Sequence, residues 1–291
     1  MSKPRAASHR SAVLVTGASS GIGRACALTL AAEGFCVVAG VRSMQDAEAL
    51  KESAQGNLST LLLDITDANQ LAHAASLLSN ELRESGLGGL INNAGICVTG
   101  PLEYVPIESL RVQLEVNVVA QIAVTQAMLP LLRRGKGRIV NIGSTSGRIA
   151  GRYAGPYCAS KFALEALTSV LRLELQSSGI AVSIIEPGIV ATPFWKKLRA
   201  AEDALAQSLP EEGWQRYGAA LRGRQQKMML WGQNGLSTAA VCDSVRHALT
   251  TSRPKLRYVV GSDARLRTTL AALLPERLWY YLGTGGSART D

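Results

Sequence analysis

A chain of 291 residues, 47% of them hydrophobic, is long enough to bury a sizeable core in one domain, although two domains would also fit this length. Its 31 basic and 22 acidic residues give a formal net charge of +9, which would attract phosphorylated cofactors, acidic lipid surfaces or nucleic acid, or serve solubility alone. Because the basic residues are scattered and no recognition motif occurs, the sequence argues against a nucleic-acid binder.

Three further features bear on where the protein works. The N-terminus is basic and polar and lacks the apolar segment of a secretory signal, so residues 1–10 are predicted to form a disordered tail. No uninterrupted apolar run of about 18 residues occurs, so no membrane-spanning helix is expected. The cysteines are odd in number and form no CxxC pair, which predicts reduced thiols in a cytoplasmic protein, with no disulfide and no metal site: Cys26, Cys36, Cys97, Cys158 and Cys242.

The first apolar run, residues 12–16, leads into a glycine-rich stretch that opens a helix. The run predicts a buried parallel strand, and GASSGIG at residues 17–23 is followed by a helical pattern through Glu33. Glycine lets the backbone turn and approach a ligand, and a helix N-terminus offers free N–H groups to an anion. The spacing GxxxGxG therefore predicts a phosphate loop, although such turns also serve packing alone. Its candidate cofactor-binding residues are Gly17, Ser19, Ser20, Gly21, Ile22 and Gly23.

The second predicted strand, residues 35–41, bears on the choice of cofactor. In an NAD-binding fold, an acidic residue near the end of this strand bonds the ribose 2′-OH. Here Arg42 follows Val41, and no acid occurs before Asp46. Since an arginine can pair with a 2′-phosphate through charge-assisted hydrogen bonds, the sequence favours NADP(H) over NAD(H). The alternative is an ordinary loop arginine.

Apolar runs and helical patterns alternate along the rest of the chain. Further strands are predicted over residues 59–63, 88–91, 137–142, 180–185 and 256–260. Helices are predicted between them over residues 44–54, 68–84, 107–133, 154–175 and 238–249. This alternation predicts an α/β fold, a doubly wound parallel sheet of Rossmann type with helices on both faces in three α/β/α layers. We expect one domain over residues 11–262.

Polar residues follow several of these strands, at the edge where ligands bind in such sheets. Asp67 is a suitable N-cap for the helix that begins at residue 68. Asn117 lies in an apolar part of the helix predicted over 107–133, where a buried amide needs a partner. The candidates at the strand ends themselves are Asp64, Ile65, Asn93, Ala94, Gly95 and Ser144.

The helical stretch that begins near Ala154 holds Tyr157 and Lys161, four residues apart. Residues i and i+4 lie one above the other on a helix, so the phenol and the ammonium are predicted to point into one site. A fixed positive charge nearby favours phenolate and is expected to lower the pKa of Tyr157 from its ordinary value of ~10. Tyr157 could then exchange a proton near neutral pH as a general acid or base. The alternative is a surface tyrosine and a solvated lysine on an amphipathic helix.

The alternation of strands and helices stops between about residues 192 and 238. This segment looks helical, is too long for a plain connection, and holds three of the four tryptophans, Trp195, Trp214 and Trp231. It predicts an amphipathic flap over an apolar site, with a peripheral helix pair as the alternative. The extension over residues 263–291 is basic, then apolar, then aromatic. Docking on the body or on a second subunit is favoured for it over peripheral membrane contact.

Taken in order, the motifs resemble those of the short-chain dehydrogenase/reductase family. They are TGASSGIG (16–23), NNAG (92–95), Asn117, Ser144, YCASK (157–161) and PGIVAT (187–192). The resemblance covers about residues 12–192. YCASKFALE and the strand end at Arg42 are most similar to the 17β-hydroxysteroid and retinol dehydrogenase branch of the family.

The resemblance implies a catalytic group. Tyr157 would be the general acid or base, and Lys161 would lower its pKa and bond the nicotinamide ribose. Ser144 would hold the substrate oxygen and stabilise charge that develops on it. Asn117 would bind a water that links Lys161 to solvent. With Ser144 and Tyr157, the substrate would meet the first flap residues, Phe194 and Trp195.

The resemblance also implies where the cofactor lies. Asp64 and Ile65 would flank the adenine, and Asn93 and Ala94, followed by Gly95, would line its ribose. The residues that would frame the nicotinamide are Pro187, Gly188, Val190 and Thr192.

Together these features predict an NADP(H)-dependent oxidoreductase that interconverts an alcohol and its ketone or aldehyde, on an apolar substrate of steroid, retinoid or long-chain type. One alternative is a 3-oxoacyl-type or small-carbonyl reductase of the same family. Another is a catalytically idle regulator that senses NADP(H), against which the intact Ser144, Tyr157 and Lys161 argue. We expect a homodimer or homotetramer with no nucleic-acid partner.

Overall fold

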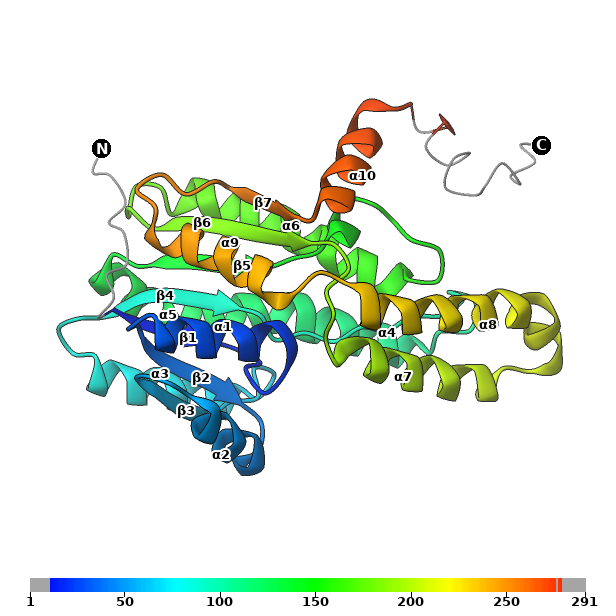
Figure 1. Cartoon of the computed structure of the whole chain (residues 1–291). Coiled ribbons are helices and arrows are strands. Elements are labelled where there is room, and N and C mark those ends of the chain that lie inside the picture. The colour runs from blue at the N-terminus through cyan, green and yellow to red at the C-terminus, as the bar shows by residue number, and fades with distance from the viewer. Residues whose placement is uncertain (1–10, 276, 279–291) are drawn as a thin grey trace.

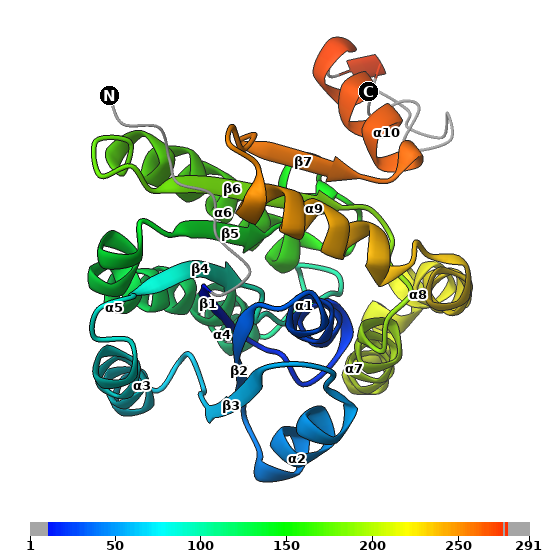
Figure 2. The same cartoon turned by 60° about the vertical axis from the view of Figure 1, so that its left-hand side comes forward.

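A parallel sheet of seven strands forms the centre of the molecule, in the order β3-β2-β1-β4-β5-β6-β7. Figures 1 and 2 show it in a computed structural model that describes residues 11–275, 277 and 278. Every predicted strand is confirmed to within two residues at either end. The strands are β1 (Ala12–Val15), β2 (Cys36–Val41), β3 (Leu58–Leu62), β4 (Leu87–Asn92), β5 (Arg138–Ile142), β6 (Ala181–Pro187) and β7 (Arg257–Val260).

Helices cover both faces of this sheet, which confirms the doubly wound α/β fold (Figure 2). α1, α2 and α9 pack on one face, and α3, α5 and α6 pack on the other. The helices labelled in Figure 1 are α1 (Gly21–Ala32), α2 (Met44–Ser53), α3 (Ala68–Glu81), α4 (Ile107–Leu114), α5 (Ala120–Gly135), α6 (Gly155–Glu174), α7 (Phe194–Ser208), α8 (Glu211–Asn234), α9 (Thr238–Thr250) and α10 (Ser262–Leu273).

The strand β1 shows why the strand sequences are apolar throughout. Val13 and Val15 belong to the core under α1 and α9, whereas Leu14 between them belongs to the core under α3 and α5. Successive side chains of a strand point to opposite faces, so a strand covered on both sides needs an apolar residue at every position. The winding of the sheet reverses between β1 and β4. Ligands bind at such a switch point, beyond the carboxyl ends of the strands.

The helical region predicted over residues 107–133 contains an irregular turn. α4 runs into a π-helical turn, Glu115–Val119, and then into α5. Taken together, Ile107–Gly135 is the one helical stretch of the described residues that is long and apolar enough to cross a membrane, by length and composition alone. Since length and composition alone do not test whether a helix crosses a membrane, the absence of a membrane-spanning helix stays a prediction. Because Val124 and Met128 lie in the core against the sheet, burial in this fold accounts for the apolar sequence.

The segment predicted as a flap forms the helix pair α7 and α8. In Figure 1 the two helices lie side by side and extend from the end of the sheet where the strands finish. They are joined by the short link at residues 209–210. This position lets them cover whatever binds at the carboxyl ends of the strands.

The extension after β7 begins with α10, which stands away from the sheet in Figures 1 and 2. One face of α10 is buried through Ala264 and Thr268. The leucines on its opposite face are exposed, namely Leu266, Leu270 and Leu273. Contact of the extension with the body, a second subunit or a membrane stays a prediction. The tail over residues 1–10 and the aromatic part of the extension lie outside the described residues.

All five cysteines are free thiols. Cys26, Cys158 and Cys242 are buried, and Cys36 and Cys97 are half-buried. The Sγ atoms of Cys26 and Cys242 lie 3.7 Å apart, in the contact between α1 and α9.

Candidate active site

The glycine-rich loop after β1 turns tightly and leaves no room for side chains. Gly17 and Gly21 have φ values of 63° and 59°, a left-handed conformation that favours glycine. A Cβ on Gly17 would lie 2.7 Å from the Cα of Ala94, and a Cβ on Gly23 would lie 2.4 Å from the carbonyl oxygen of Gly17. Bare backbone is thus brought to the N-terminus of α1, as a dinucleotide pyrophosphate requires. The residues present therefore fit a dinucleotide.

Asn93 supports this loop with its side chain. Its Nδ2 donates to the carbonyl oxygens of Thr16 at 2.9 Å and of Gly17 at 3.0 Å. The hydroxyl of Thr16 in turn accepts from the backbone N–H groups of Asn93 at 3.0 Å and of Ala94 at 3.1 Å. These bonds join the ends of β1 and β4 at the switch point. Sequence reasoning missed Thr16, and a role for Asn93 and Ala94 in lining a ribose stays a prediction.

Arg42 and Asp64 lie at neighbouring strand ends, because β2 pairs with β3. The hydroxyl and the backbone N–H of Thr66 donate to Asp64 at 2.7 and 2.9 Å, and these bonds are the largest cause of its lowered pKa. The nearby charge of Arg42 lowers the pKa of Asp64 further. Ile65, the next residue, is buried. The exposed guanidinium of Arg42 is therefore available at this edge, while the carboxylate of Asp64 is held in its own turn.

Tyr157 and Lys161 are near neighbours on α6, as their spacing predicted. Nζ of Lys161 lies 5.8 Å from the centre of the Tyr157 ring and donates to the carbonyl oxygen of Ile142 at 2.8 Å. Burial lowers the pKa of Lys161 to about 8 and raises the pKa of Tyr157. The predicted lowering of the Tyr157 pKa is therefore wrong for this arrangement. Desolvation of the phenolate outweighs the attraction of a lysine whose own charge burial disfavours.

Ser144 opposes the effect of burial on Tyr157. A hydrogen bond between their side chains lowers the pKa of the phenol, against the larger rise that burial causes. Ser144 also caps the short 3-10 turn Thr145–Gly147, where its Oγ accepts from the N–H of Ser146 at 3.1 Å. That bond fixes the hydroxyl at the tip of β5, so Ser144 and Tyr157 can reach one oxygen of a substrate together.

Asn117 lies in the π-helical turn between α4 and α5 and is fully buried. Its Oδ1 accepts from the N–H of Ile96 at 2.9 Å, and its Nδ2 donates to the carbonyl oxygen of Ile96 at 3.0 Å and to Oγ of Ser160 at 3.1 Å. The amide thus joins the loop after β4 to α6, next to Tyr157. These bonds use both N–H groups of the amide and one lone pair of its oxygen, and the binding of a relay water at Asn117 stays a prediction.

The end of β6 meets both the glycine-rich loop and α10. A Cβ on Gly188 would lie 3.1 Å from Cβ of Ala264, so α10 packs on this strand end. Val190 pairs with Leu236 in an isolated parallel bridge. A Cβ on Gly21 would lie 3.6 Å from Cβ of Thr192. Residues 187–192, predicted to frame the nicotinamide, therefore lie against the start of α1.

Aromatic rings connect Tyr157 to the flap. The distance between ring centres is 6.3 Å for Tyr157 and Phe194, 5.2 Å for Phe194 and Trp195, and 5.3 Å for Trp195 and Trp231. Nε1 of Trp195 donates to the carbonyl oxygen of Val190 at 2.8 Å, which fixes this ring. The structure does not bring Trp214 into this group, since Trp214 stacks with Arg222 instead. Phe194 is thus the predicted substrate residue that lies beside Tyr157.

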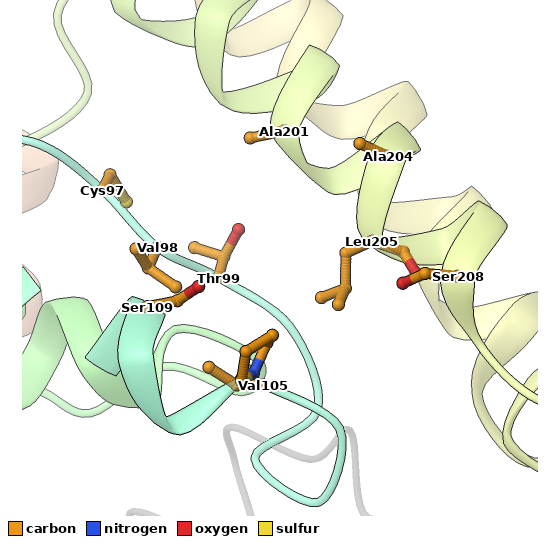
Figure 3. A pocket seen from close by; sticks show the side chains of 10 residues that line it. Cys97, Val98, Thr99, Val105, Ser109, Ala201, Ala204, Leu205 and Ser208 are labelled. Carbon is orange, nitrogen blue, oxygen red and sulfur yellow. The ribbon is translucent and has the colours of Figure 1, made fainter. Parts of the chain in front are cut away.

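A cavity of about 320 Å³ opens between α7 and the loop that follows β4 (Figure 3). Cys97 lies both in its wall and close enough to Tyr157 to raise the pKa of the phenol. Cys97 also acts electrostatically on Lys161, so this wall of the cavity lies near the catalytic group. Its walls are mostly apolar, with three hydroxyls: Cys97, Val98, Thr99, Val105, Pro106, Ser109, Ala201, Ala204, Leu205 and Ser208.

Buried polar groups tie the wall of this cavity to the flap. The hydroxyl of Thr99 donates to Oε1 of Glu202 at 2.5 Å, and Nε of Arg224 donates to the same oxygen at 2.7 Å. Thr99 belongs to the loop after β4, Glu202 to α7 and Arg224 to α8. One carboxylate therefore joins three segments around the cavity. Sequence reasoning missed this contact, because nothing in the sequence pairs such distant residues.

Comparison with known proteins settles the family. A family model described as "short chain dehydrogenase" matches residues 11–203. The chain belongs to the short-chain dehydrogenase/reductase family. Members are NAD(P)-dependent oxidoreductases, and this chain is an alcohol dehydrogenase or carbonyl reductase of that kind.

Individual proteins are similar to this dehydrogenase/reductase over most of its length. Retinol dehydrogenase 5 of Mus musculus is 39% identical over 274 residues, which cover 91% of this chain and 85% of that protein. The 17-beta-hydroxysteroid dehydrogenase type 6 of Bos taurus is 36% identical over 277 residues, covering 94% and 87% of the two chains. The crystal structure of a short-chain dehydrogenase from Streptomyces avermitilis matches with a TM-score of 0.73 at 27% identity, covering 97% and 98%.

This dehydrogenase/reductase also buries charged residues near Lys161 that sequence reasoning missed. Glu165 lies on α6 one turn after Lys161, and Glu186 lies on β6 directly before Pro187. Both are paired with Arg257 of β7. The available signal was a glutamate at an otherwise apolar position of a buried strand, where a charge needs a partner.

Proposed function

We propose that this short-chain dehydrogenase/reductase uses NADP(H) to interconvert an alcohol and its ketone or aldehyde, with Tyr157 as the general acid or base. One observation carries the proposal: Tyr157 is hydrogen-bonded to Ser144, lies beside Lys161 and is within electrostatic reach of Cys97 in the wall of an apolar cavity. Proton donor, oxygen-binding hydroxyl and substrate space thus adjoin one another.

The geometry suggests how the proton moves. Bound NADP(H) would supply or accept the hydride. In reduction, Tyr157 gives its proton to the carbonyl oxygen as charge develops there, while Ser144 holds that oxygen by a hydrogen bond. Because burial raises the pKa of Tyr157, the neutral phenol is the resting form, which is the form that donates. Lys161, with a pKa of about 8, can return a proton to the phenolate near neutral pH.

Burial of Tyr157 also has a consequence for the direction of the reaction. Oxidation of an alcohol needs Tyr157 to accept a proton, so the phenolate must form first. The hydrogen bond from Ser144 favours that phenolate, but burial opposes it more strongly. We therefore expect the oxidative rate to rise with pH over a range in which the reductive rate falls.

The cavity supports an apolar substrate. Its walls come mainly from valine, alanine, leucine and proline side chains, and Phe194, at the start of α7, packs its ring against that of Tyr157. Two relatives carry retinol and 17-beta-hydroxysteroid in their names. We therefore propose a substrate of steroid, retinoid or long-chain type, with the carbonyl at Tyr157 and the apolar body between α7 and the loop after β4.

Arg42 supports the choice of NADP(H). It is exposed at the end of β2, and its charge is felt at Asp64 on the neighbouring strand end. A guanidinium there can pair with a 2′-phosphate, and Val41 offers no carboxylate to a 2′-OH. A cytoplasmic location and a homodimer or homotetramer remain predictions beside this proposal.

The proposal is tested by following NADPH oxidation with a panel of carbonyl compounds. We expect turnover of a ketosteroid, retinal or a long-chain ketone, and its loss in Tyr157→Phe. Turnover restricted to a 3-oxoacyl thioester or a small aldehyde would select the reductase alternative. Tight NADPH binding without turnover of any compound in either direction would select the idle regulator.

A further inference from the structure

A cluster of two buried glutamates and two half-buried arginines joins the catalytic helix to the end of β6. Glu165 is 8% exposed and Glu186 is fully buried. Arg257 reaches them from β7, and Arg148 reaches Glu186 from the residue after the 3-10 turn. Through Glu165 the cluster adjoins the helix turn that holds Lys161, and through Glu186 it adjoins Pro187; these two parts of the site must hold their spacing.

Arg257 brings the two carboxyl groups together. Its Nε donates to Oε1 of Glu186, and its Nη2 donates to Oε2 of Glu165 at 2.6 Å. These two nitrogens form one edge of the guanidinium, an edge that commonly binds both oxygens of a single carboxylate. Here it binds one oxygen from each of two glutamates, so the two groups lie side by side.

The other oxygen of each glutamate has no ordinary donor. Oε1 of Glu165 and Oε2 of Glu186 are buried and have no hydrogen-bond partner among the described residues. Nη1 of Arg148 lies 3.9 Å from Oε2 of Glu186, which is too far for a hydrogen bond. A buried carboxylate oxygen without a donor is costly, and two adjoining carboxylates resist being ionised together.

We propose that Glu165 and Glu186 share one proton, with Oε2 of Glu186 donating to Oε1 of Glu165, and that this acid pair positions Lys161 against the end of β6. A single proton satisfies both oxygens and removes the repulsion between the two groups. The positioning role rests on the function proposed above, whereas the shared proton does not.

Charge in the cluster agrees with a proton held at neutral pH. Burial and then the charge of Glu165 raise the pKa of Glu186 to about 8, and Arg257 and Arg148 oppose this only in part. The charged groups that face the pair are Arg148 after β5, Arg257 on β7 and Lys161 on α6. The negative charge of Glu165 also favours the charged form of Lys161.

Tight packing would transmit a movement of Glu165 to Lys161. A Cβ on Gly147 would lie 2.9 Å from the carbonyl oxygen of Lys161 and 3.0 Å from Cγ of Glu165. The turn after β5 therefore packs against α6 at the height of both residues. If both carboxylates were ionised, their repulsion would displace Glu165, and the close packing would pass this displacement on to Lys161.

The shared proton is tested by infrared spectroscopy and by the pH dependence of stability. An unfolded glutamate loses its proton at a pKa of ~4.3, whereas the pair holds one proton up to about pH 8. Stability from the pair is therefore fully present below the unfolded value and lost as the pH rises through 8. Between these values the unfolding constant should rise by up to tenfold per pH unit.

The matched variants are Glu186→Gln and Glu202→Gln. An amide at 186 can donate to Glu165 as the protonated acid does, so Glu186→Gln should remove both the infrared C=O stretch of a protonated carboxyl at neutral pH and the pH-dependent loss of stability. Glu202 is also buried, with one oxygen bound by Arg224 and the other without a partner among the described residues, but its contacts are to Thr99 and Arg224. Glu202→Gln should keep both signals. Absence of the carboxyl band in the wild type, or its persistence in Glu186→Gln, would overturn the shared proton.

Positioning is tested by comparing two substitutions at the same residue. Glu186→Gln should keep kcat/KM within about threefold of the wild type at neutral pH, whereas Glu186→Ala, which leaves Glu165 and Arg257 short of a partner, should lower it about tenfold or more. The wild type should also lose kcat/KM above pH 8 by a step that Glu186→Gln lacks. Equal activities of the Ala and Gln variants would refute the positioning role while leaving the infrared result to decide on the proton. Absence of turnover in the wild type would count against the proposed function, and the infrared test would still stand.

Discussion

The cofactor side and the substrate side of this active site are built from different materials. The cofactor side consists of backbone brought close together: a Cβ on Gly17 or Gly23 would overlap Ala94, Asn93 or the loop itself. The substrate side consists of side chains on two helices, where Phe194, Trp195 and Trp231 touch one another through their rings. A backbone cradle tolerates no added atom, whereas side-chain contacts can be rearranged. The difference suggests a fixed cofactor site beside an adjustable substrate site.

Tyr157 lies where the cofactor side and the substrate side meet, and its substitution should have the largest effect. Turnover should be lost while cofactor binding remains. Tyr157→Phe keeps the ring that packs against Phe194 and removes the transferable proton. We expect turnover to fall by ~10²–10⁴-fold, which is what general acid–base catalysis contributes. NADPH binding, measured by quenching of tryptophan fluorescence, should persist. A Phe variant that kept more than a tenth of the wild-type rate would show that Tyr157 is not the proton donor.

Replacing one glycine by alanine on each side, Gly23 in the glycine-rich loop and Gly223 in α8, compares the packed backbone with the helix surface directly. In Gly23→Ala the new Cβ would lie 2.3 Å from Nδ2 of Asn93 and 2.4 Å from the carbonyl oxygen of Gly17. We expect a loss of about 1–3 kcal/mol of stability or more, with weaker NADPH binding. Gly223 lies within α8, and beyond its chain neighbours and the backbone of its own helix no atom lies within 4 Å of such a Cβ, so Gly223→Ala should stabilise the protein by about 0.4–1 kcal/mol. Thermal unfolding measures both, and equal effects of the two substitutions would remove the contrast.

The exposed end of the cofactor site should respond to charge alone. Arg42→Ala should weaken NADPH binding by about 10- to 100-fold, since a charge-assisted hydrogen bond contributes ~1.5–3 kcal/mol. NADH binding should hardly change, because NADH carries no 2′-phosphate. Raised salt should reduce the wild-type preference, because Arg42 is exposed and its charge is screened. The ratio of kcat/KM for NADPH over NADH decides, and a wild-type ratio near or below one would return Arg42 to an ordinary loop residue.

How much could be read from the sequence also differs between the two sides. The strands, the glycine-rich loop and the spacing of Tyr157 and Lys161 were predictable, because backbone constraints and helical periodicity leave local patterns. The pKa of Tyr157 was not, since it depends on burial by distant segments. The contact of Thr99 with Glu202 and that of Glu165 with Glu186 join residues far apart in the chain, and no local pattern encodes such pairs. On the substrate side the sequence indicated helices rich in tryptophan but not which of the rings meet.

The smallest expected effect is a change in tryptophan fluorescence when the flap helices α7 and α8 move on substrate binding. Trp195 and Trp231 touch each other and lead through Phe194 to Tyr157, whereas Trp214 stacks with Arg222. A tight substrate or inhibitor added to the cofactor complex should therefore change tryptophan emission, as α7 and α8 close over the cavity. Trp231→Phe should remove much of that change, because a phenylalanine still fills the apolar contact but does not emit in the tryptophan range. Trp214→Phe is the matched control on the same helix and should leave the change intact.

Proteolysis within residues 195–231 should slow at the same time. Two outcomes would contradict closure of the flap: loss of the emission change in Trp214→Phe rather than in Trp231→Phe, or no change in emission or proteolysis although binding is shown independently. Either would indicate that α7 and α8 do not move when the substrate binds.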